Sequence, residues 1–247
     1  MVDYTAEPRL IEMWQRMATR TPGPSTIKEV GGVPCGDMVN GCYFGTVTPA
    51  EIFGTGLNND SIVGNVTGGV EGNGNGYNFS GTNMPDHTTT PWLKFGYMGK
   101  ILFVSQKPLK YNTSWNHINA CLGSVDGSSQ NARRVFRGIG YKVRLMTGTL
   151  RSPYEAENTS GGEWNALIYG VHSSNPDGRS PQWDTFSDAD IVVASGNGRG
   201  SWTQEVSSLS SGHRVNRGLS SVATLNPGTA SSTGTHGGLR LVLESLN

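Results

Sequence analysis

The stretch from Trp92 to Leu122 constrains the fold most strongly, because it holds the clearest succession of strand, turn and helix signals in the chain. Residues 92–97 form a short segment that is rich in aromatic side chains. After the turn-forming Gly99, an uninterrupted apolar run extends from Ile101 to Val104. A run of this length between turn signals predicts a buried strand. The stretch therefore predicts two strands joined by a turn.

A capped helix is predicted directly after these strands. Ser114 suits the N-cap position, and Trp115, Ile118 and Leu122 share one helical face. Gly123 is well placed to end the helix. Three tryptophans are predicted to belong to the core: Trp92, Trp115 and Trp164.

Residues Thr5 to Ala18 predict the best amphipathic helix of the sequence. One interpretation is a helix that packs on its own domain, and the other is a helix that docks on a partner or on copies of the same chain. The Pro/Gly-rich sequence TRTPGPS that follows has the composition of a linker and favours docking. The apolar stripe, and hence the expected assembly interface, consists of Leu10, Ile11, Trp14 and Met17.

Residues 21–91 contain few strong helix or strand signals, and residues 58–83 are dominated by Gly, Asn, Ser and Thr. Such a segment buries too little apolar surface to fold alone. We predict an extended arm that is ordered by contact. The expected organisation is thus a docking helix over 1–20, a Gly/Asn-rich arm over 21–91 and one domain over 92–247.

The remaining elements are short. Residues 139–146 alternate apolar and polar side chains and predict a half-buried strand. Residues 163–171 predict a short helix, or a helix that runs into a strand. The other expected elements are a strand over 190–194, a strand from Trp202 to Val206, a short element over 214–218, a loop over 225–238 and a closing strand over 239–243.

The overall composition excludes several classes of protein. The chain has 19 basic and 19 acidic residues, whereas a nucleic-acid-binding protein usually shows a basic excess. No apolar run reaches the ~20 residues needed to cross a bilayer, and the first residues lack the apolar core of a signal peptide. We therefore expect Cys35, Cys42 and Cys121 to be reduced thiols; the alternative is a Cys35–Cys42 bridge or an intermolecular one.

No catalytic motif stands out, so we predict a protein that is not an enzyme and has no cofactor. The five histidines lack metal-ligand spacing. Asp184, Asp188 and Asp190 form the main carboxylate cluster. Their oxygens are of the kind that Ca²⁺ binds, but helix-capping and turn roles are the simpler interpretation, and no metal is predicted. Glu163 with Glu155 and Glu157 is a weaker candidate for a glycosidase pair.

Five short strings in order give the chain a resemblance to a known family. After KILFVSQKPLKYNTSWNHINACLG come YKVRLMTG, GGEWNALIYGV, SWTQE, RVNRG and GLRLVLE. Residues 92–243 resemble a C-type lectin-like domain of the kind found in bacteriophage virion proteins, which carry strings similar to SWxxI, RLLTG, EWN, RVxRG and GWRPVLE. The last string here lacks the aromatic residue and the proline. EPN, QPD and WND, typical of calcium-dependent lectins, are absent, as is the late cysteine pair of formylglycine-generating enzymes.

The resemblance implies a loop-rich α+β fold with a C-type lectin-like domain after an extended N-terminal arm that carries one amphipathic helix. It also implies a non-enzymatic virion component of the tail, collar, baseplate or capsid decoration, made in the host cytoplasm and located in the virion. Its partners would be other virion proteins, copies of itself and a host-surface glycan or protein. The alternatives are a structural joint without a ligand and a carboxylate-dependent polysaccharide hydrolase.

The late loops, over residues 173–212, are the expected ligand-binding face, because the resemblance places the late loops of this fold on the presenting side. Flat aromatic rings beside amides and cations suit sugar rings and peptide surfaces. For Trp202 a core position is the stronger alternative, because a strand pattern continues after it. The candidate residues are Trp183, Asn197, Arg199, Trp202 and, just beyond the loops, His213.

Overall fold

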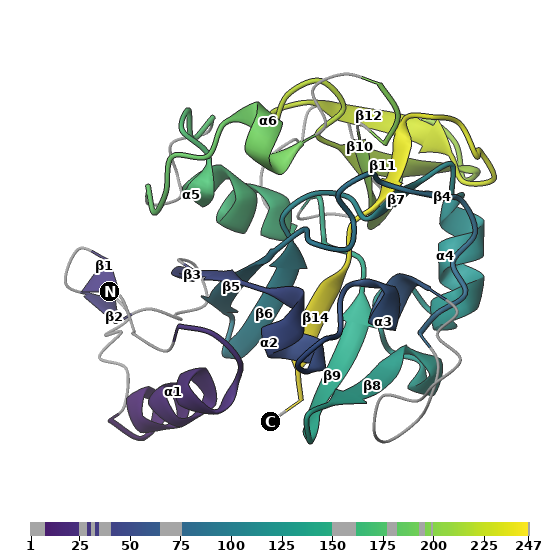
Figure 1. Cartoon of the computed structure of the whole chain (residues 1–247). Helices are drawn as coiled ribbons and strands as arrows, with labels where there is room; N and C mark the ends of the chain where they lie inside the picture. Colours follow the sequence, from purple (N-terminus) through teal and green to yellow (C-terminus); the bar gives the residue numbers. More distant parts are fainter. Residues whose placement is uncertain are drawn as a thin grey trace.

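The computed structural model describes residues 8–24, 29–30, 33–34, 41–64, 76–149, 162–176, 182–192, 196–198 and 200–246. Two six-stranded sheets within these residues give a mixed α+β fold (Figure 1). The first sheet has the order β3 (Cys42–Val47), β5 (Trp92–Tyr97), β6 (Lys100–Ser105), β14 (Val242–Ser245), β9 (Ile139–Arg144) and β8 (Arg133–Phe136). The second has the order β12 (Leu225–Thr229), β11 (His213–Arg217), β10 (Gly200–Val206), β13 (Gly237–Leu239), β7 (Lys110–Tyr111) and β4 (Thr82–Asn83).

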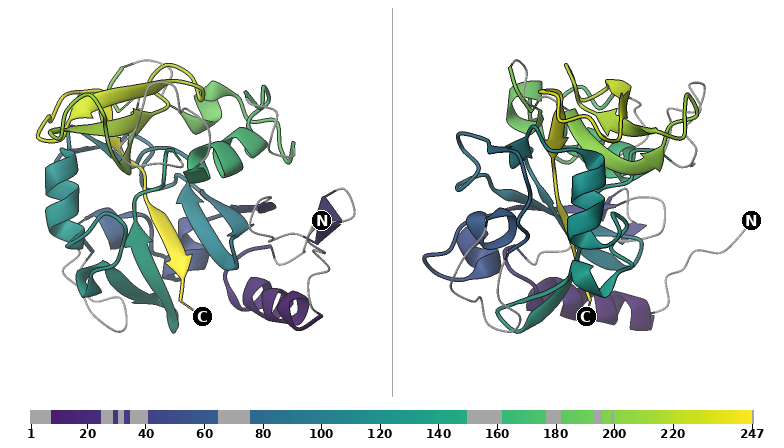
Figure 2. Two further views of the ribbon diagram at one scale, coloured as in Figure 1. Left: turned by 180° about the vertical axis from the view of Figure 1, so that it is seen from behind. Right: turned by 90° about the vertical axis from the view of Figure 1, so that its right-hand side faces the viewer.

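Short helices surround the two sheets. The longest, α1 (Pro8–Arg20), lies at the periphery, and α4 (Trp115–Leu122) runs along one side from the second sheet toward the first (Figures 1 and 2). The others are α2 (Pro49–Phe53), α3 (Asp60–Val63), the 3₁₀ turn η1 (Gln130–Ala132), the π-helix η2 (Trp164–Ile168), which continues into α5 (Tyr169–Val171), and α6 (Asp188–Ile191). A separate two-stranded ribbon pairs β1 (Glu29–Val30) with β2 (Val33–Pro34).

The strand–turn–strand–helix order predicted for residues 92–122 is confirmed. β5 and β6 pair in an antiparallel hairpin whose turn residues, Met98 and Gly99, have φ values of 48° and 76°. Positive φ at both turn positions matches the twist of a tight hairpin. The Ser114 hydroxyl accepts a hydrogen bond of 3.1 Å from the His117 amide, and Gly123 ends α4 in the left-handed conformation. Trp92, Trp115 and Trp164 are buried, as predicted.

The first sheet is buried on both faces, which explains the uninterrupted apolar run of β6. Ile101 and Phe103 belong to one hydrophobic cluster, and Leu102 and Val104 to a second cluster on the opposite face. Side chains alternate between the two faces of a strand, so a strand buried on both sides has no polar positions to alternate with.

The C-terminal segment links the two sheets. β13 pairs with β7 and β10 in the second sheet, and after Arg240 and Leu241 the chain enters the first sheet as β14, between β6 and β9. Figure 1 shows this segment in yellow, descending through the middle of the molecule. Arg240 is buried at the crossing and donates to the carbonyl oxygens of Ser105 and Gln106, which ties the sheets together.

Several sequence-based expectations are corrected. The described parts of the expected arm, residues 41–64 and 76–91, supply β3 and core residues such as Phe53 and Ile62, so they share the core of the following domain. Residues 188–191 form α6 and not a strand, because Ser187 and Asp190 make a capping box. Residues 225–229, expected as loop, form β12 along β11.

The expectation of three reduced cysteines is wrong for Cys42, which is disulfide-bonded. Cys35 lies outside the described residues. Cys121 is a free thiol, as predicted, and its sulfur lies 3.3 Å from Nε2 of His117 on the same helix. Burial raises the pKa of the Cys121 thiol, which therefore stays protonated at neutral pH.

The end of α1 is attached to the first sheet by a buried lysine. Nζ of Lys94, on β5, donates to the carbonyl oxygens of Ala18 at 3.0 Å and Thr21 at 3.2 Å. The same ammonium lies 5.6 Å from the ring centroid of Phe44 and 5.9 Å from that of Phe103. A cation near helix C-terminal carbonyls is favourable, so Lys94 holds this end of α1 against the domain.

We expect the free energy of unfolding to rise with pH from about pH 8 to about pH 10, and a Lys94→Met variant to lack this slope. Burial lowers the pKa of Lys94 from 10.5 to about 8. In this range the unfolded chain holds more protons than the folded chain, so raising the pH favours folding, by roughly 3 kcal/mol at most. Urea unfolding of both proteins across the range measures the difference, and parallel curves would contradict the assignment.

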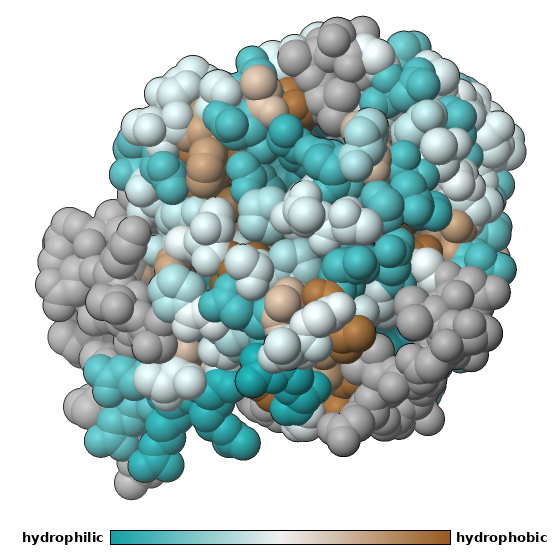
Figure 3. All heavy atoms as spheres, in the orientation of Figure 1, coloured by the Kyte–Doolittle hydropathy of each residue, from teal (hydrophilic) through white to brown (hydrophobic). Residues whose placement is uncertain are grey.

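The surface seen in the orientation of Figure 1 is largely hydrophilic, with small, separate hydrophobic areas (Figure 3). Leu57, Met98, Val135 and Leu209 are among the exposed apolar side chains, and they come from different elements. Single exposed apolar residues are normal on a folded domain and do not by themselves mark an interface.

Candidate functional site

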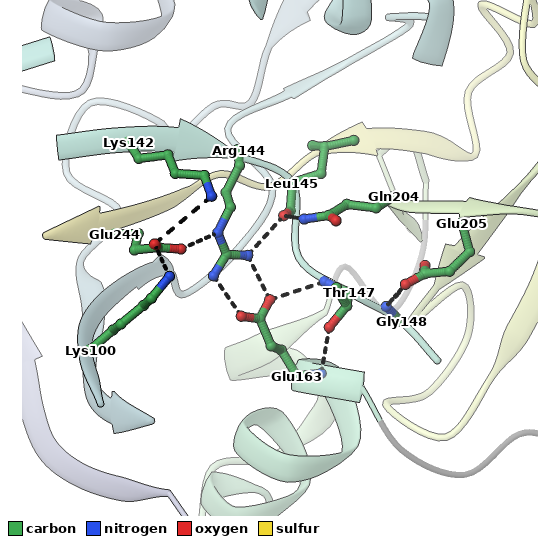
Figure 4. Close-up of polar contacts among 10 residues, drawn as sticks. All are labelled: Lys100, Lys142, Arg144, Leu145, Thr147, Gly148, Glu163, Gln204, Glu205 and Glu244. Carbon is green, nitrogen blue, oxygen red and sulfur yellow. Dashed lines mark hydrogen bonds and ion pairs between the residues drawn. The ribbon is translucent and has the colours of Figure 1, made fainter. Parts of the chain in front are cut away.

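A buried ionic network lies where β9 leaves the first sheet (Figure 4). Nε of Arg144 donates to Oε2 of Glu244 at 2.8 Å, and its two terminal nitrogens donate to the two carboxylate oxygens of Glu163 at 2.7 and 2.5 Å. All three side chains are at most 9% exposed. The paired contact with Glu163 uses the planar fork that makes arginine suited to carboxylates. Arg144 thus joins β9 to β14 and to the start of η2.

The network continues into the segment after β9. The amide of Thr147 donates to Glu163 Oε2 at 3.0 Å, and the Thr147 hydroxyl accepts from the Glu163 amide at 2.8 Å. These reciprocal hydrogen bonds fix the start of the π-helix against residues 144–148. On the other side, Lys100 and Lys142 approach the Glu244 carboxylate from the neighbouring strands.

The charges in this network stabilise one another. Burial alone would lower the pKa of Arg144, but Glu163 and Glu244 raise it above the ordinary arginine value. Burial would likewise raise the pKa of Glu244, but Arg144 and Lys100 lower it. Arg144 and Glu244 therefore stay ionised at neutral pH although they are buried.

Glu205, on β10, is buried in a different way. Its carboxylate accepts hydrogen bonds from the Gly148 amide at 3.0 Å and from the Thr203 hydroxyl at 2.6 Å. Among the described residues no cationic group lies within 4.0 Å of it. Burial raises the pKa of Glu205, and the hydrogen bonds offset only part of that shift.

A pocket of about 420 Å³ opens beside Glu205. This size falls within the usual range for small-molecule sites. Its walls come from α4 and the loop that follows it, from the segment after β9 and from β10, and none of its lining residues is Lys, Arg or His. The lining residues are Trp115, Asn119, Ser124, Val125, Asp126, Thr147, Thr149, Gln204, Glu205 and Val206.

Asp126, the second carboxylate of the pocket, is exposed and ionised. The Ser124 hydroxyl donates to its Oδ1 at 2.6 Å and the Ser128 amide at 2.8 Å, and these contacts lower its pKa to about 2. Asn119 accepts from the Val125 amide through Oδ1, which leaves its side-chain NH₂ available. Gln204 donates to the Leu145 carbonyl at 2.6 Å, and this bond holds its side chain in place. The pocket therefore presents fixed hydrogen-bonding groups next to the indole of Trp115.

The residues predicted to bind a ligand are not brought together. Trp202 is buried and donates from Nε1 to the Thr113 carbonyl at 2.9 Å, so it is a core residue and cannot face a ligand, which corrects that assignment. Trp183 is half-buried against Phe95, with ring centroids 6.1 Å apart. Asn197 is exposed in a turn next to β7, and His213 begins β11. Arg199 lies outside the described residues.

The three aspartates have separate structural roles. Asp190 caps α6 through Ser187, and Asp188 accepts from the Val222 amide at 2.6 Å and lies 3.3 Å from His172. Asp184 shares a hydrogen bond with Tyr43. The candidate glycosidase residue Glu163 is held by Arg144, so both of its oxygens are engaged. Glu155 and Glu157 lie outside the described residues.

Met17 of the expected assembly interface is half-buried and packs against the domain's own core, which favours the alternative of a helix packed on its own domain for this position. The side chains of Leu10, Ile11 and Trp14 lie outside the described residues.

The pocket beside Glu205 was missed by sequence reasoning, because Asn119, Asp126 and Gln204 show no pattern that distinguishes them from ordinary loop and surface residues.

Comparison with known proteins finds no matching family model, no matching curated protein and no matching solved structure. In the described part of the chain no helix has the length and apolar character to cross a membrane. Within the same residues no group of three or more His, Cys, Asp or Glu side chains is placed to hold a metal ion.

Proposed function

We propose that the chain is a non-enzymatic component of a bacteriophage particle, in the tail, collar, baseplate or capsid decoration, and that its lectin-like domain binds a host-surface ligand in the Glu205 pocket. The observation that carries this proposal is the pocket, whose walls belong to three separate segments held by hydrogen bonds: α4 with the loop after it, the segment after β9, and β10. A site fixed before the ligand arrives loses less conformational entropy on binding.

The positions of the five strings support the proposed likeness to phage virion proteins. Each string supplies a member of the buried polar contacts around residues 144–148, and a rigid network of this kind constrains residue identity because each buried polar group needs its partner. The contributing residues are Arg144 and Gly148 from RLMTG, Glu163 and Asn165 from EWN, Glu205 from SWTQE, Arg217 from RVNRG and Glu244 from GLRLVLE.

Attachment to the particle is assigned to the amino-terminal region. α1 lies at the periphery, and its described side chains meet the domain near its end, where Met17 and Ala18 pack against the core and Lys94 binds the carbonyl oxygens of Ala18 and Thr21. A helix attached in this way leaves the pocket free, because the pocket is built from α4, β10 and the segment after β9.

Filling the pocket with a large side chain is expected to abolish ligand binding without affecting assembly. In an Asn119→Trp variant the indole enters the pocket from α4, and adsorption of particles to host cells is expected to fall at least tenfold, with the protein present in normal amount. Asn116→Trp is the matched control, because Asn116 is exposed on the same helix and does not line the pocket. Adsorption rates of particles carrying each variant provide the measurement.

If Asn119→Trp particles adsorb at the wild-type rate, the proposed binding role is contradicted. A structural joint without a ligand would then be the better interpretation. Loss of polysaccharide cleavage, rather than of adsorption, in an Asp126→Asn or Glu205→Gln variant would instead favour the hydrolase alternative. The binding protein, the structural joint and the hydrolase therefore predict different results for the same set of variants.

A further inference from the structure

We infer that the Glu205 pocket binds a sugar that carries a free primary ammonium group; this inference rests on the proposed binding role of the same pocket. The three buried glutamates of the described chain differ in their charged partners. Glu163 and Glu244 share the guanidinium of Arg144, whereas Glu205 has no cationic group within 4.0 Å among the described residues. Buried carboxylates are normally paired with a cation, so the exception calls for an explanation.

Glu205 is also the buried glutamate that faces an open pocket. It is 5% exposed and lines the cavity, and its carboxylate accepts hydrogen bonds from the amides of Gly148 and Thr149 and from the Thr203 hydroxyl. All of these donors are neutral, so they leave the negative charge of the carboxylate without a neighbouring positive charge. An ammonium group that enters the pocket would supply the positive charge and the donor that the fold itself supplies to Glu163 and Glu244.

The surrounding charges favour the same type of ligand. Asp126, ionised and exposed, is the second carboxylate of the lining, and its hydrogen-bond donors, Ser124 and Ser128, are neutral. Arg214 stacks 4.2 Å from the ring of Trp115 but donates to the carbonyls of Ser211 and His213 and does not line the pocket. Arg217 donates to the carbonyl oxygen of Gly148, whereas Glu205 accepts from the amide of Gly148.

The pocket therefore disfavours phosphate, uronic and sialic groups, which would meet two carboxylates and no cation in its lining; Lys142, whose charge acts on Asp126, does not line the pocket. The remaining lining suits a sugar ring. Trp115 and Val206 provide apolar surface, and Asn119 and Gln204 provide amide groups for hydroxyls. A cavity of about 420 Å³ that opens to solvent admits one ring of a longer glycan.

Titration of the full chain with glucosamine, N-acetylglucosamine and glucuronate, followed by calorimetry, tests the inference. Glucosamine is expected to bind at least tenfold more tightly than the other two, which share its ring but lack the positive charge. Glu205→Gln and Asp126→Asn are each expected to weaken glucosamine binding at least tenfold. Glu205→Gln keeps the size and the hydrogen-bonding oxygen of the side chain, and an unchanged melting temperature verifies that it folds.

Asp86→Asn is the matched control, because it replaces an exposed carboxylate outside the pocket and should leave glucosamine binding unchanged. Equal binding of glucosamine and N-acetylglucosamine, blocked by Asn119→Trp, would overturn the ammonium inference but leave the proposed binding role intact. Absence of binding by all three sugars, together with normal adsorption of Asn119→Trp particles, would overturn both. Binding of a lysine amide, without binding of glucosamine, would contradict the inference that the ligand is a sugar. The pocket would then be a site for a basic side chain of a partner protein.

Discussion

An Arg144→Ala variant is expected to lose about 3–5 kcal/mol of unfolding free energy, enough to unfold many domains of this size. The substitution leaves the carboxylates of Glu163 and Glu244 buried without their shared cation, and neither side chain is more than 9% exposed. It also removes the connection between β9, β14 and the start of η2. Urea or thermal unfolding of the two proteins measures the loss.

Lys100→Ala is the control within the same network. Lys100 also contacts Glu244, but its side chain is 48% exposed, so water replaces most of the lost interaction. We expect this variant to lose less than about 1 kcal/mol. Equal losses for Arg144→Ala and Lys100→Ala would show that burial of the ion pairs does not determine their contribution, contrary to the structure.

Trp164→Ala is expected to have the second large effect, a loss of about 3–5 kcal/mol of unfolding free energy. Trp164 is fully buried, and its Nε1 donates to the Val222 carbonyl at 2.9 Å. Its ring centroid lies 5.7 Å from the guanidinium carbon of Arg217 and 5.3 Å from that of Arg240. Truncation therefore leaves a cavity, an unpaired carbonyl and two buried cations without their aromatic contact.

Trp183→Ala is the matched control, because it removes the same side chain from a half-buried position against Phe95. We expect a smaller but measurable loss of stability. Trp183 is thus a poor choice for a variant that tests binding alone, since its partial burial links any effect on adsorption to stability. Thermal unfolding of the two variants side by side compares the positions, and a larger loss for Trp183→Ala would contradict the burial of Trp164.

Sequence patterns predicted the elements that are stabilised mainly by residues close to one another in the chain. The tight turn of the β5–β6 hairpin and the Ser114 cap of α4 are of this kind, and both were predicted. The α6 helix was missed because a four-residue helix has too short an apolar pattern to distinguish it from a strand. β12 was missed because LNPGT has little strand character and is aligned by its pairing with β11.

The role of the described residues 41–64 and 76–91 depended on contacts across the chain. Asn59 donates to the carbonyl oxygens of His87 and Thr90, and accepts from Nε1 of Trp92 at 2.8 Å. These bonds bring the polar segment around Asn59 into the same core as the strands that follow. Composition alone predicted an arm, because it does not show which apolar residues find partners.

By itself the sequence determined the hairpin and helix of residues 92–122 and the buried tryptophans, because each follows from local propensity and side-chain periodicity. It also predicted β9 as a strand, but the expected half-buried pattern is wrong at Arg144, which is buried. Only the tertiary structure decided which charges are buried and which are paired. Arg144 meets Glu163 across 19 residues and Glu244 across 100. Nothing in the local sequence distinguishes these groups from solvated ones, because the free energy that keeps them charged comes from long-range contacts. The same holds for Glu205, whose pocket exists only where α4, β10 and the segment after β9 meet.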